Sequence, residues 1–284
     1  MLAQTYREVR ATLVAKDGRH IPVLFHGNTV KSADGRTLGN VAFVTDLSDQ
    51  MKGMALASEV QKSLLPTDFH ATGELDIAAR SLPCDEIGGD YYDYIEVPER
   101  GEVHLVVGDM TGHGVDAALL MTTARAFLRM RARQPGTAED MVNDLNRHLT
   151  SDTRHTDRFM TLFFLSLDMH RRRMQWIRAG HDPAVLYDPA SGQTTWLRGP
   201  GLALGVDPDW VYEESSGVVQ EGQIVVLTTD GVWEARNPSG VMFGKDRFKG
   251  VIRESASLSA EGIRLAVMKA VSSFQGEAQA DDDI

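Results

Sequence analysis

Four acidic clusters contain the residues of this sequence that could do chemistry. They are Gly88-Gly89-Asp90-Tyr91-Tyr92-Asp93, Gly108-Asp109-Met110-Thr111-Gly112-His113-Gly114, Thr229-Asp230-Gly231 and the terminal Asp281-Asp282-Asp283. Because glycine lets the backbone approach an ion closely, carboxylates and carbonyls beside it can serve as ligands. A single Asp-Gly pair is an ordinary turn, whereas the four clusters together favour a shared site.

The types of these ligands indicate which ion they would bind. Carboxylates with few histidines nearby select hard cations, Mg2+ or Mn2+ rather than Zn2+. Cys84 is the only cysteine, which excludes an intrachain disulfide and a cysteine-rich zinc site. Two hard cations roughly 3.5 to 4 Å apart can hold both the attacking and the leaving oxygen of a phosphoryl displacement. The sequence therefore favours two-metal phosphate chemistry.

The elements that must position these acids follow in blocks of strands and helices. Predicted strands after Pro66 are 75–81, 91–97, 103–108, 161–167, 174–179, 184–187 and 223–228, and predicted helices are 115–133, 137–149 and 260–274. Thr137 to Asp140 resembles a capping box that opens the second helix. Strand runs that flank paired helices imply an α+β layered domain built on antiparallel sheets. The acidic clusters fall at strand ends or in turns, where side chains can converge.

The N-terminal part predicts a small sheet followed by a helix. Alternating apolar runs at 9–15, 21–30 and 38–45 are separated by Asp-Gly turns, which is the pattern of antiparallel hairpins. A helix is expected over 46–65, with an apolar stripe of Leu56, Val60 and Leu64, and it ends at Pro66. This helix has two open interpretations: a linker that packs on its own domain, or a dimerising or signal-carrying helix that would form a homodimer.

Composition limits the partners and the location. The formal net charge of -11 makes nucleic acid an unlikely partner and repels phosphorylated substrates at long range, so local cations are needed. No apolar run approaches the roughly 20 residues of a membrane span. The start MLAQTYREVR does not have the pattern of a secretory signal, so we expect a cytoplasmic protein. Arg125, Arg129, Arg131 and Arg133 form a basic run that is expected to be a solvated helix face, with docking of an acidic phosphoprotein as the alternative.

The ordered motifs of residues 63–284 resemble the PPM family of metal-dependent protein phosphatases, in its bacterial stage-II-sporulation-E type. The matching words are SLLP, EIGGDYYDYI, VVGDMTGHGVDAALLM, MTLFF, RAGHDPAVLY, GLALGV, LTTDGVWEA and DDDI. The resemblance covers about three quarters of the chain. It implies an αββα sandwich, in which two antiparallel sheets are flanked by helices.

The resemblance also implies roles for individual residues. Asp90 would bind one metal, Asp109 would bridge both, the carbonyl of Met110 would add a ligand, and Asp230 would hold the other metal. Of the terminal acids, Asp282 matches the metal-binding position, with Asp283 as the alternative. In this reading, hydroxide activated by the two ions, Mn2+ or Mg2+, attacks the phosphoserine phosphorus in line with no phosphoenzyme intermediate.

Three residues near these ligands have open roles. His113 could donate a proton to the leaving seryl oxygen, which would make it catalytic with Asp109, or it could only hydrogen-bond its turn. His181, at a strand end, could line the site or be structural. Asp93 is expected to support the metal ligands rather than to bind an ion.

A second resemblance concerns the N-terminal region. The stretch KDGRHIPVLFHGNTVKSADGRTLGNVAFVTDLSDQ resembles the C-terminal half of a PAS sensor domain. We therefore expect three parts: a PAS fragment over 1–46, a linker or regulatory helix over 47–66, and a phosphatase domain over 67–284. Family members continue past the position of Ile284 with a further strand, so the final strand of the phosphatase domain is expected to be missing here.

These resemblances predict a serine/threonine protein phosphatase in bacterial signalling and stress response. Its expected substrate is a phosphorylated anti-sigma-factor antagonist of the STAS type. The alternative is a catalytically silent module of the same fold that switches partners. A third hypothesis, a diguanylate cyclase, starts from Gly88-Gly89-Asp90, but Tyr-Tyr-Asp follows where cyclases have a Glu-Phe type of continuation.

Overall fold

The chain forms two compact units. The computed structural model describes residues 7–67, 69, 75–112, 114–278, 280 and 282–284. The units are Met1–Val60 and Gln61–Ile284. Within the described residues, no helix combines the length and apolarity that a membrane span requires.

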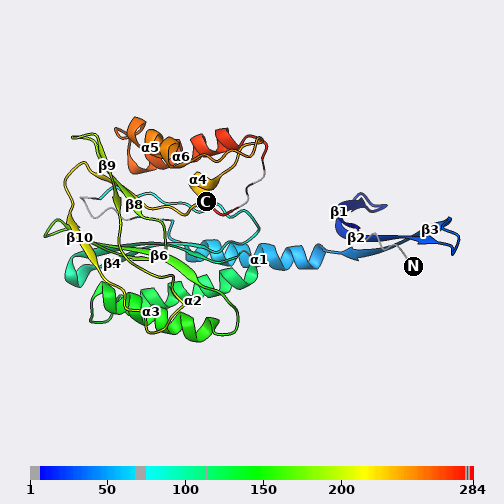
Figure 1. The fold of residues 1–284 in the computed structure, drawn as a ribbon, viewed down its shortest axis with the longest axis horizontal. Helices are drawn as coiled ribbons and strands as arrows, with labels where there is room; N and C mark the ends of the chain where they lie inside the picture. Colours follow the sequence, from blue (N-terminus) through cyan, green and yellow to red (C-terminus); the bar gives the residue numbers. More distant parts are fainter. Residues whose placement is uncertain (1–6, 68, 70–74, 113, 279, 281) are drawn as a thin grey trace. The chain divides into compact units, whose positions relative to one another are not determined.

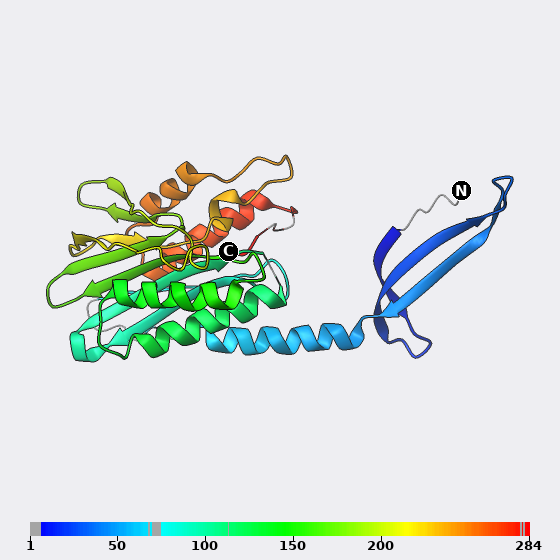
Figure 2. The same ribbon diagram turned by 60° about the horizontal axis from the view of Figure 1, so that its bottom comes forward.

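The first unit is a three-stranded antiparallel sheet with the first turns of a helix. Its strands are β1 (Arg7–Val14), β2 (His20–Lys31) and β3 (Thr37–Asp46), in the order β1-β2-β3 (Figure 2). The Asp-Gly turns are confirmed, because Gly18 and Gly35 each adopt a φ of 85°, which favours glycine. Helix α1 (Ser48–Leu64) follows as predicted, with Leu56 and Val60 of its apolar stripe exposed.

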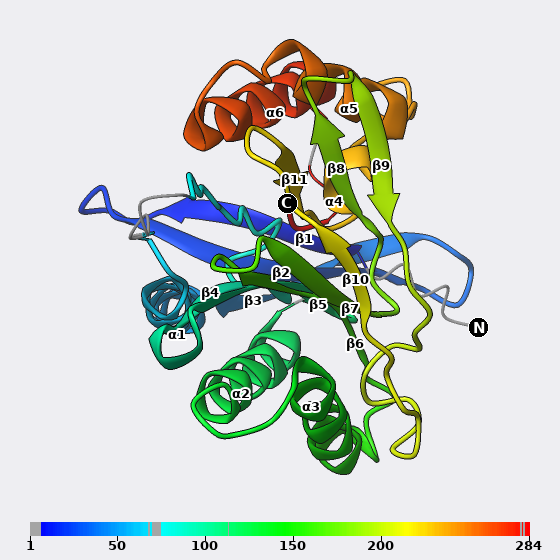
Figure 3. The ribbon, with the colours of Figure 1, turned by 90° about the vertical axis from the view of Figure 1, so that its left-hand side faces the viewer.

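The second unit has four layers, which confirms the expected α+β sandwich. A five-stranded antiparallel sheet has the order β10-β7-β6-β5-β4, and a three-stranded antiparallel sheet has the order β11-β8-β9. Helices α2 and α3 cover the larger sheet, and α5 and α6 cover the smaller one (Figures 1 and 3). In chain order, the elements of this second unit are β4 (Asp90–Val97), η1 (Pro98–Arg100), β5 (Glu102–Met110), α2 (Val115–Arg131), α3 (Ala138–Thr153), β6 (Met160–Asp168), β7 (Arg173–Ala179), β8 (Ala184–Asp188), β9 (Gln193–Leu197), β10 (Ser215–Val218), β11 (Ile224–Val226), α4 (Gly231–Glu234), α5 (Lys245–Glu254) and α6 (Ala260–Gln275).

Each gap between layers holds its own apolar core. Leu128 and Phe164 belong to the core between α2, α3 and the larger sheet. Leu165 and Leu197 belong to the core between the two sheets, and Val185 and Phe248 to the core beneath α4 to α6. Neighbouring residues of one strand, such as Phe164 and Leu165, enter different cores because strand side chains alternate between faces. The sheets are therefore buried on both sides, and their ends are where polar groups can gather.

Several details differ from the sequence predictions. The predicted strand 75–81 is wrong, because these residues have no strand structure. Leu82, which follows them, exchanges backbone hydrogen bonds with Ile284, at 2.5 and 3.0 Å. β11 is shorter than the expected 223–228 because only three residues pair with β8. Strands β9 and β10 and helix α5 were not predicted from the sequence. The capping box is confirmed, since Thr137 and Asp140 bond each other's backbone N–H groups.

Two arginines of the basic run, Arg129 and Arg131, are paired with acids of other elements. Arg129 forms a two-point ion pair with Asp93 of β4, with Nε to Oδ2 at 2.7 Å. Arg131 donates to Asp144 of α3 at 2.7 Å and keeps only 11% of its side chain exposed. The carboxylates that pair with these arginines come from other elements, so a helix-face pattern could not reveal them.

Candidate metal centre

The first two acids meet across the β4–β5 hairpin. Asp90 is the first residue of β4 and lies directly opposite Asp109 of β5. Directly opposed residues of an antiparallel pair have Cβ atoms roughly 4.5 to 5.5 Å apart on one face. Their neighbours Tyr91 and Met110 pack in the core against the helices, so Asp90 and Asp109 face the other way, toward the second sheet. The sheet register thus brings together two acids that are 19 positions apart in sequence.

The third acid follows β11 at the start of the short helix α4. Thr229 donates its hydroxyl to Asp90 Oδ2 at 2.9 Å, and this bond orients one oxygen of a carboxylate that is only 8% exposed. Asp230 follows Thr229 directly and acts electrostatically on Asp109. The Thr-Asp-Gly motif therefore contributes a hydroxyl as well as the predicted carboxylate.

The terminal segment, residues 282–284, reaches the turn before β4 and carries the last acids. The Asp283 carboxylate accepts backbone N–H groups from Cys84 at 2.8 Å, Gly89 at 2.9 Å and Asp90 at 3.4 Å. A Cβ added at Gly88 would overlap this carboxylate, and one at Gly231 would overlap the Asp283 carbonyl oxygen. Both glycines are required for this close approach. The C-terminus is marked in Figure 3 beside α4 and β11.

Both terminal acids accept backbone N–H groups, Asp282 from Asp283 at 2.9 Å, but they differ in exposure. Asp283 is 4% exposed and its oxygens already accept backbone N–H groups, which makes it an anchor for the terminal segment. Asp282 is exposed, and it is the foremost charge that raises the pKa of Asp109. This difference favours Asp282 over Asp283 as a ligand.

The electrostatics of the cluster reveal carboxylates that repel one another. Burial first, and then Asp109 and Asp283, raise the pKa of Asp90 well above its ordinary value. Burial, followed by Asp282, Asp230 and Asp283, raises the pKa of Asp109 to about 7. Grouped acids of this kind are relieved by a bound cation, and an all-oxygen donor set suits a hard one. The residues present therefore fit Mg2+ or Mn2+ in chemistry.

The acids lie in one region, but among the described residues they do not form a ready ion-binding group. Over residues 75–112, 114–278 and 282–284, no three His, Cys, Asp or Glu side chains form a group that could hold an ion as they stand. The Met110 carbonyl borders the same region, since a Cβ on Gly89 would lie 2.7 Å from its oxygen. The ligand set named from the sequence thus remains a proposal.

His181 is held from both sides. Its Nδ1 lies 2.8 Å from the Thr161 hydroxyl and its Nε2 lies 3.2 Å from the Thr228 carbonyl oxygen. The ring is 4% exposed, and burial lowers its pKa. A neutral His181 that donates to Thr228 and accepts from Thr161 fixes the residues just before Asp230, which favours the structural interpretation.

The remaining candidates have different positions. Asp93 is paired with Arg129 and accepts the Tyr91 hydroxyl at 2.8 Å, so it lies on the helix-facing side of β4, opposite to Asp90. Neither of these bonds reaches a predicted metal ligand, so the expectation that Asp93 supports the metal ligands stays a prediction. His113 and Asp281 lie outside the described residues.

One contact to the cluster had no signal in the sequence. Gln61 of α1 donates its amide to the Gly88 carbonyl oxygen at 2.7 Å and accepts the Gly88 N–H at 3.2 Å. It therefore holds the same turn as Asp283, immediately before Asp90. A glutamine on a helix is ordinarily solvated, so only the fold reveals this role.

The four layers and the acids between the sheets define the α+β fold of PP2C-type phosphatase domains. Residues 99–284 match the family model described as Stage II sporulation protein E (SpoIIE). Since this match covers more than half of the chain, the protein belongs to that family. Membership agrees with the resemblance found in its motifs.

Individual relatives agree with this assignment. Phosphoserine phosphatase RsbU of Bacillus subtilis is 26% identical over 209 residues, which are 74% of this chain and 62% of RsbU. Phosphoserine phosphatase RsbP of the same organism is 27% identical over 187 residues, 64% of this chain and 45% of RsbP. The SiaA-PP2C domain of Pseudomonas aeruginosa superimposes with a TM-score of 0.71 at 25% identity, covering 83% of this chain and 94% of that one. The chain spans less than two thirds of the length of these curated relatives.

Proposed function

We propose that this protein is a metal-dependent protein serine/threonine phosphatase of bacterial signalling. The observation that carries the proposal is that Asp90 and Asp109 lie opposite each other and that Asp230 and Asp282 act on the pKa of Asp109, in the SpoIIE family fold. Two relatives carry the name phosphoserine phosphatase. The substrate we propose is phosphoserine on a STAS-type anti-sigma-factor antagonist.

The chain's own residues have defined tasks in this proposal. Asp90, Asp109, Asp230, Asp282 and the Met110 carbonyl would hold two ions, Mn2+ or Mg2+. When bound, these ions would supply positive charge that offsets the phosphate's negative charge and activates water. Thr229 orients Asp90, His181 fixes the approach to Asp230, and Asp283 holds the glycine turn before Asp90. His113 remains the candidate proton donor to the leaving oxygen.

The N-terminal parts complete the proposal. We propose that residues 1–46 are the C-terminal part of a PAS sensor and that 47–66 are a regulatory helix, through which two copies could form a homodimer. The division of the chain after Val60 falls inside that predicted helix. The expected location is cytoplasmic.

The direct test is phosphate release from a phosphoserine protein substrate with Mn2+ present. We expect turnover that rises with Mn2+ or Mg2+ and disappears with a chelator, because the carboxylates need a cation to act on phosphate. A phosphorylated STAS-type protein and a generic phosphate ester would be compared. Absence of release from either substrate in saturating Mn2+ would instead favour the silent partner-switching module.

Replacing Gln61 by Ala is expected to lower turnover about tenfold and to weaken Mn2+ binding. Both hydrogen bonds to Gly88 are lost, and each contributes on the order of 0.5 to 1.5 kcal/mol to holding the turn before Asp90. Steady-state phosphate release and Mn2+ titration measure the two effects. Gln50→Ala, on the same helix, is the matched control because Gln50 is exposed. Equal turnover of the two variants would rule out a positioning role.

A further inference from the structure

A polar cavity of about 450 Å³ lies at the end of the larger sheet away from the metal centre. The side chains that line it include Arg100, Glu102, His104, Ser166, Gln175 and Glu214. His104 and Asp109 are five positions apart on β5, which is roughly 16 Å at about 3.3 Å per residue. The cavity is therefore separate from the acidic cluster between the sheets, and its volume falls within the range of small-molecule sites.

One wall of this cavity is a row of polar side chains that lies beside an apolar row on the same face of the sheet. His104, Ser166 and Gln175 are paired across β5, β6 and β7, so they form one polar row on the face toward α3. The next row on that face, two residues further along each strand, is apolar. It consists of Val106, Phe164 and Ile177, each 1% exposed or less. A polar row beside a fully buried apolar one indicates that these side chains serve the cavity rather than the core.

The buried polar side chain that most favours a ligand in this cavity is His104. Its side chain is 1% exposed, and within the described residues neither ring nitrogen has a hydrogen-bond partner. Burial, and then the charge of Arg100, lower its pKa to about 4, so the ring is neutral near pH 7. A neutral imidazole offers one donor and one acceptor. Since buried polar groups are nearly always bonded, a ligand or a water in the cavity would satisfy His104.

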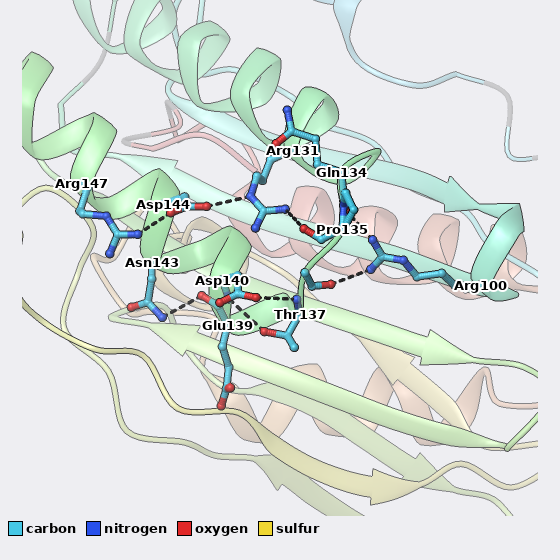
Figure 4. Close-up of polar contacts among 11 residues, drawn as sticks. Arg100, Arg131, Gln134, Pro135, Thr137, Glu139, Asp140, Asn143, Asp144 and Arg147 are labelled. Atoms are coloured by element: carbon cyan, nitrogen blue, oxygen red, sulfur yellow. Dashed lines mark hydrogen bonds and ion pairs between the residues drawn. The ribbon is translucent and has the colours of Figure 1, made fainter.

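The cavity's positive groups are already occupied. Arg100 donates to the Gly136 carbonyl oxygen at 2.9 Å and to that of Gln134 at 2.6 Å, which pins the loop between α2 and α3 (Figure 4). The first turn of α3, where an anion could bind, is closed by the reciprocal bonds of Thr137 and Asp140 (Figure 4). An anionic ligand would therefore find few free donors.

The carboxylates of the cavity have oxygen atoms that can still accept hydrogen bonds. Glu102 Oε2 lies 3.9 Å from both Arg100 Nη1 and His104 Nε2, beyond hydrogen-bond range. Glu139 accepts the Glu214 N–H at 3.0 Å, and Glu214 accepts the Gln175 amide. Each of these contacts uses one of the two oxygens of its carboxylate. Arg173 Nη2 also lies 3.8 Å from Glu214 Oε1, so three carboxylates face two guanidinium groups and the balance remains negative.

We propose that this polar cavity binds a small organic cation with N–H donors, an amine or guanidinium compound, through His104, Glu102 and Glu214. The cation's N–H groups donate to the acceptor nitrogen of His104 and to the open carboxylate oxygens. Its positive charge offsets the negative lining. The site is independent of phosphate hydrolysis, so it would add a small-molecule input at the far end of β5 from Asp109.

The test is calorimetric titration of the whole chain with agmatine and putrescine, with butane-1,4-diol and glutarate as neutral and anionic comparisons. We expect one saturable site for at least one of the two cations and none for the diol or the dianion. His104→Phe removes both ring nitrogens, and Glu102→Gln removes one charge. Each is expected to weaken cation binding at least tenfold, as befits a lost charge-assisted bond.

Glu221→Gln is the matched control for Glu102→Gln, because Glu221 is an exposed carboxylate outside the cavity and its loss should leave binding unchanged. Glu102→Gln decides the matter if His104→Phe does not fold. The proposal is overturned if neither cation binds, which would mean that water satisfies His104. It is equally overturned if Glu102→Gln binds the cations as tightly as the unaltered chain does.

Discussion

Replacing Asp109 by Asn is expected to lower phosphate release by about a thousandfold or more. Asp109 lies opposite Asp90, and three further acids, Asp230, Asp282 and Asp283, act on its pKa. It is therefore the carboxylate best placed to be shared by two ions. Charge stabilisation by bound metal is worth several kcal/mol, and each 1.36 kcal/mol is tenfold in rate. Single-turnover phosphate release in saturating Mn2+ measures the loss.

The matched control for this variant is Glu96→Gln, since Glu96 is an exposed acid near the other end of β4. Its turnover should stay within about twofold of the unaltered chain. If Asp109→Asn kept a tenth or more of the original rate, Asp109 could not be the shared ligand.

The same variant is expected to stabilise the metal-free fold. The pKa of Asp109 is raised from 3.8 to about 7, so the folded chain binds this proton more tightly than the unfolded chain does. Stability from this group is therefore present below about pH 4 and is lost as the pH rises toward 7. Asp109→Asn removes this pH-dependent loss of folding stability. Thermal unfolding with a chelator at pH 5 and pH 7.5 should show a smaller difference for the variant than for the unaltered chain.

The local patterns predicted most of the fold because each could be read within one element. Apolar runs identified β4 to β8, and the Thr137 to Asp140 motif identified the start of α3. The 75–81 stretch also contains apolar residues, but it lacks a strand partner there, and pairing is a property of the fold. Strand β10 was missed because its sequence, Ser-Ser-Gly-Val, has little apolar pattern.

The candidate site likewise contains residues that the local sequence could identify and contacts that it could not. Asp90, Asp109 and Asp230 could be named because glycine beside aspartate is visible in the sequence. The anchoring of Asp283 by three backbone N–H groups, the contact of Gln61 with Gly88 and the pairing of Asp93 with Arg129 each join distant segments. No spacing rule links such residues, since the contacts exist only when the sheets and helices have packed.

Replacing Asp283 by Ala is expected to lower turnover about a hundredfold and to weaken Mn2+ binding. The Cys84, Gly89 and Asp90 N–H groups would lose their shared acceptor, and the terminal segment would lose its anchor. A hydrogen bond to a charged group is worth about 1.5 to 3 kcal/mol, so losing two or three of them releases the segment that carries Asp282. Phosphate release and Mn2+ titration report the two effects.

Asp283→Asn separates anchoring from metal binding. The amide oxygen of Asn still accepts a backbone N–H, so an anchor should keep turnover within about tenfold of the unaltered chain. Asp282→Asn keeps the anchor but loses the carboxylate that acts most strongly on Asp109, so it should be the more damaging of the two amide variants. If Asp283→Asn were as inactive as Asp283→Ala while Asp282→Asn remained active, Asp283 rather than Asp282 would be the metal ligand. The terminal segment would then bind the ion through its buried acid instead of its exposed one.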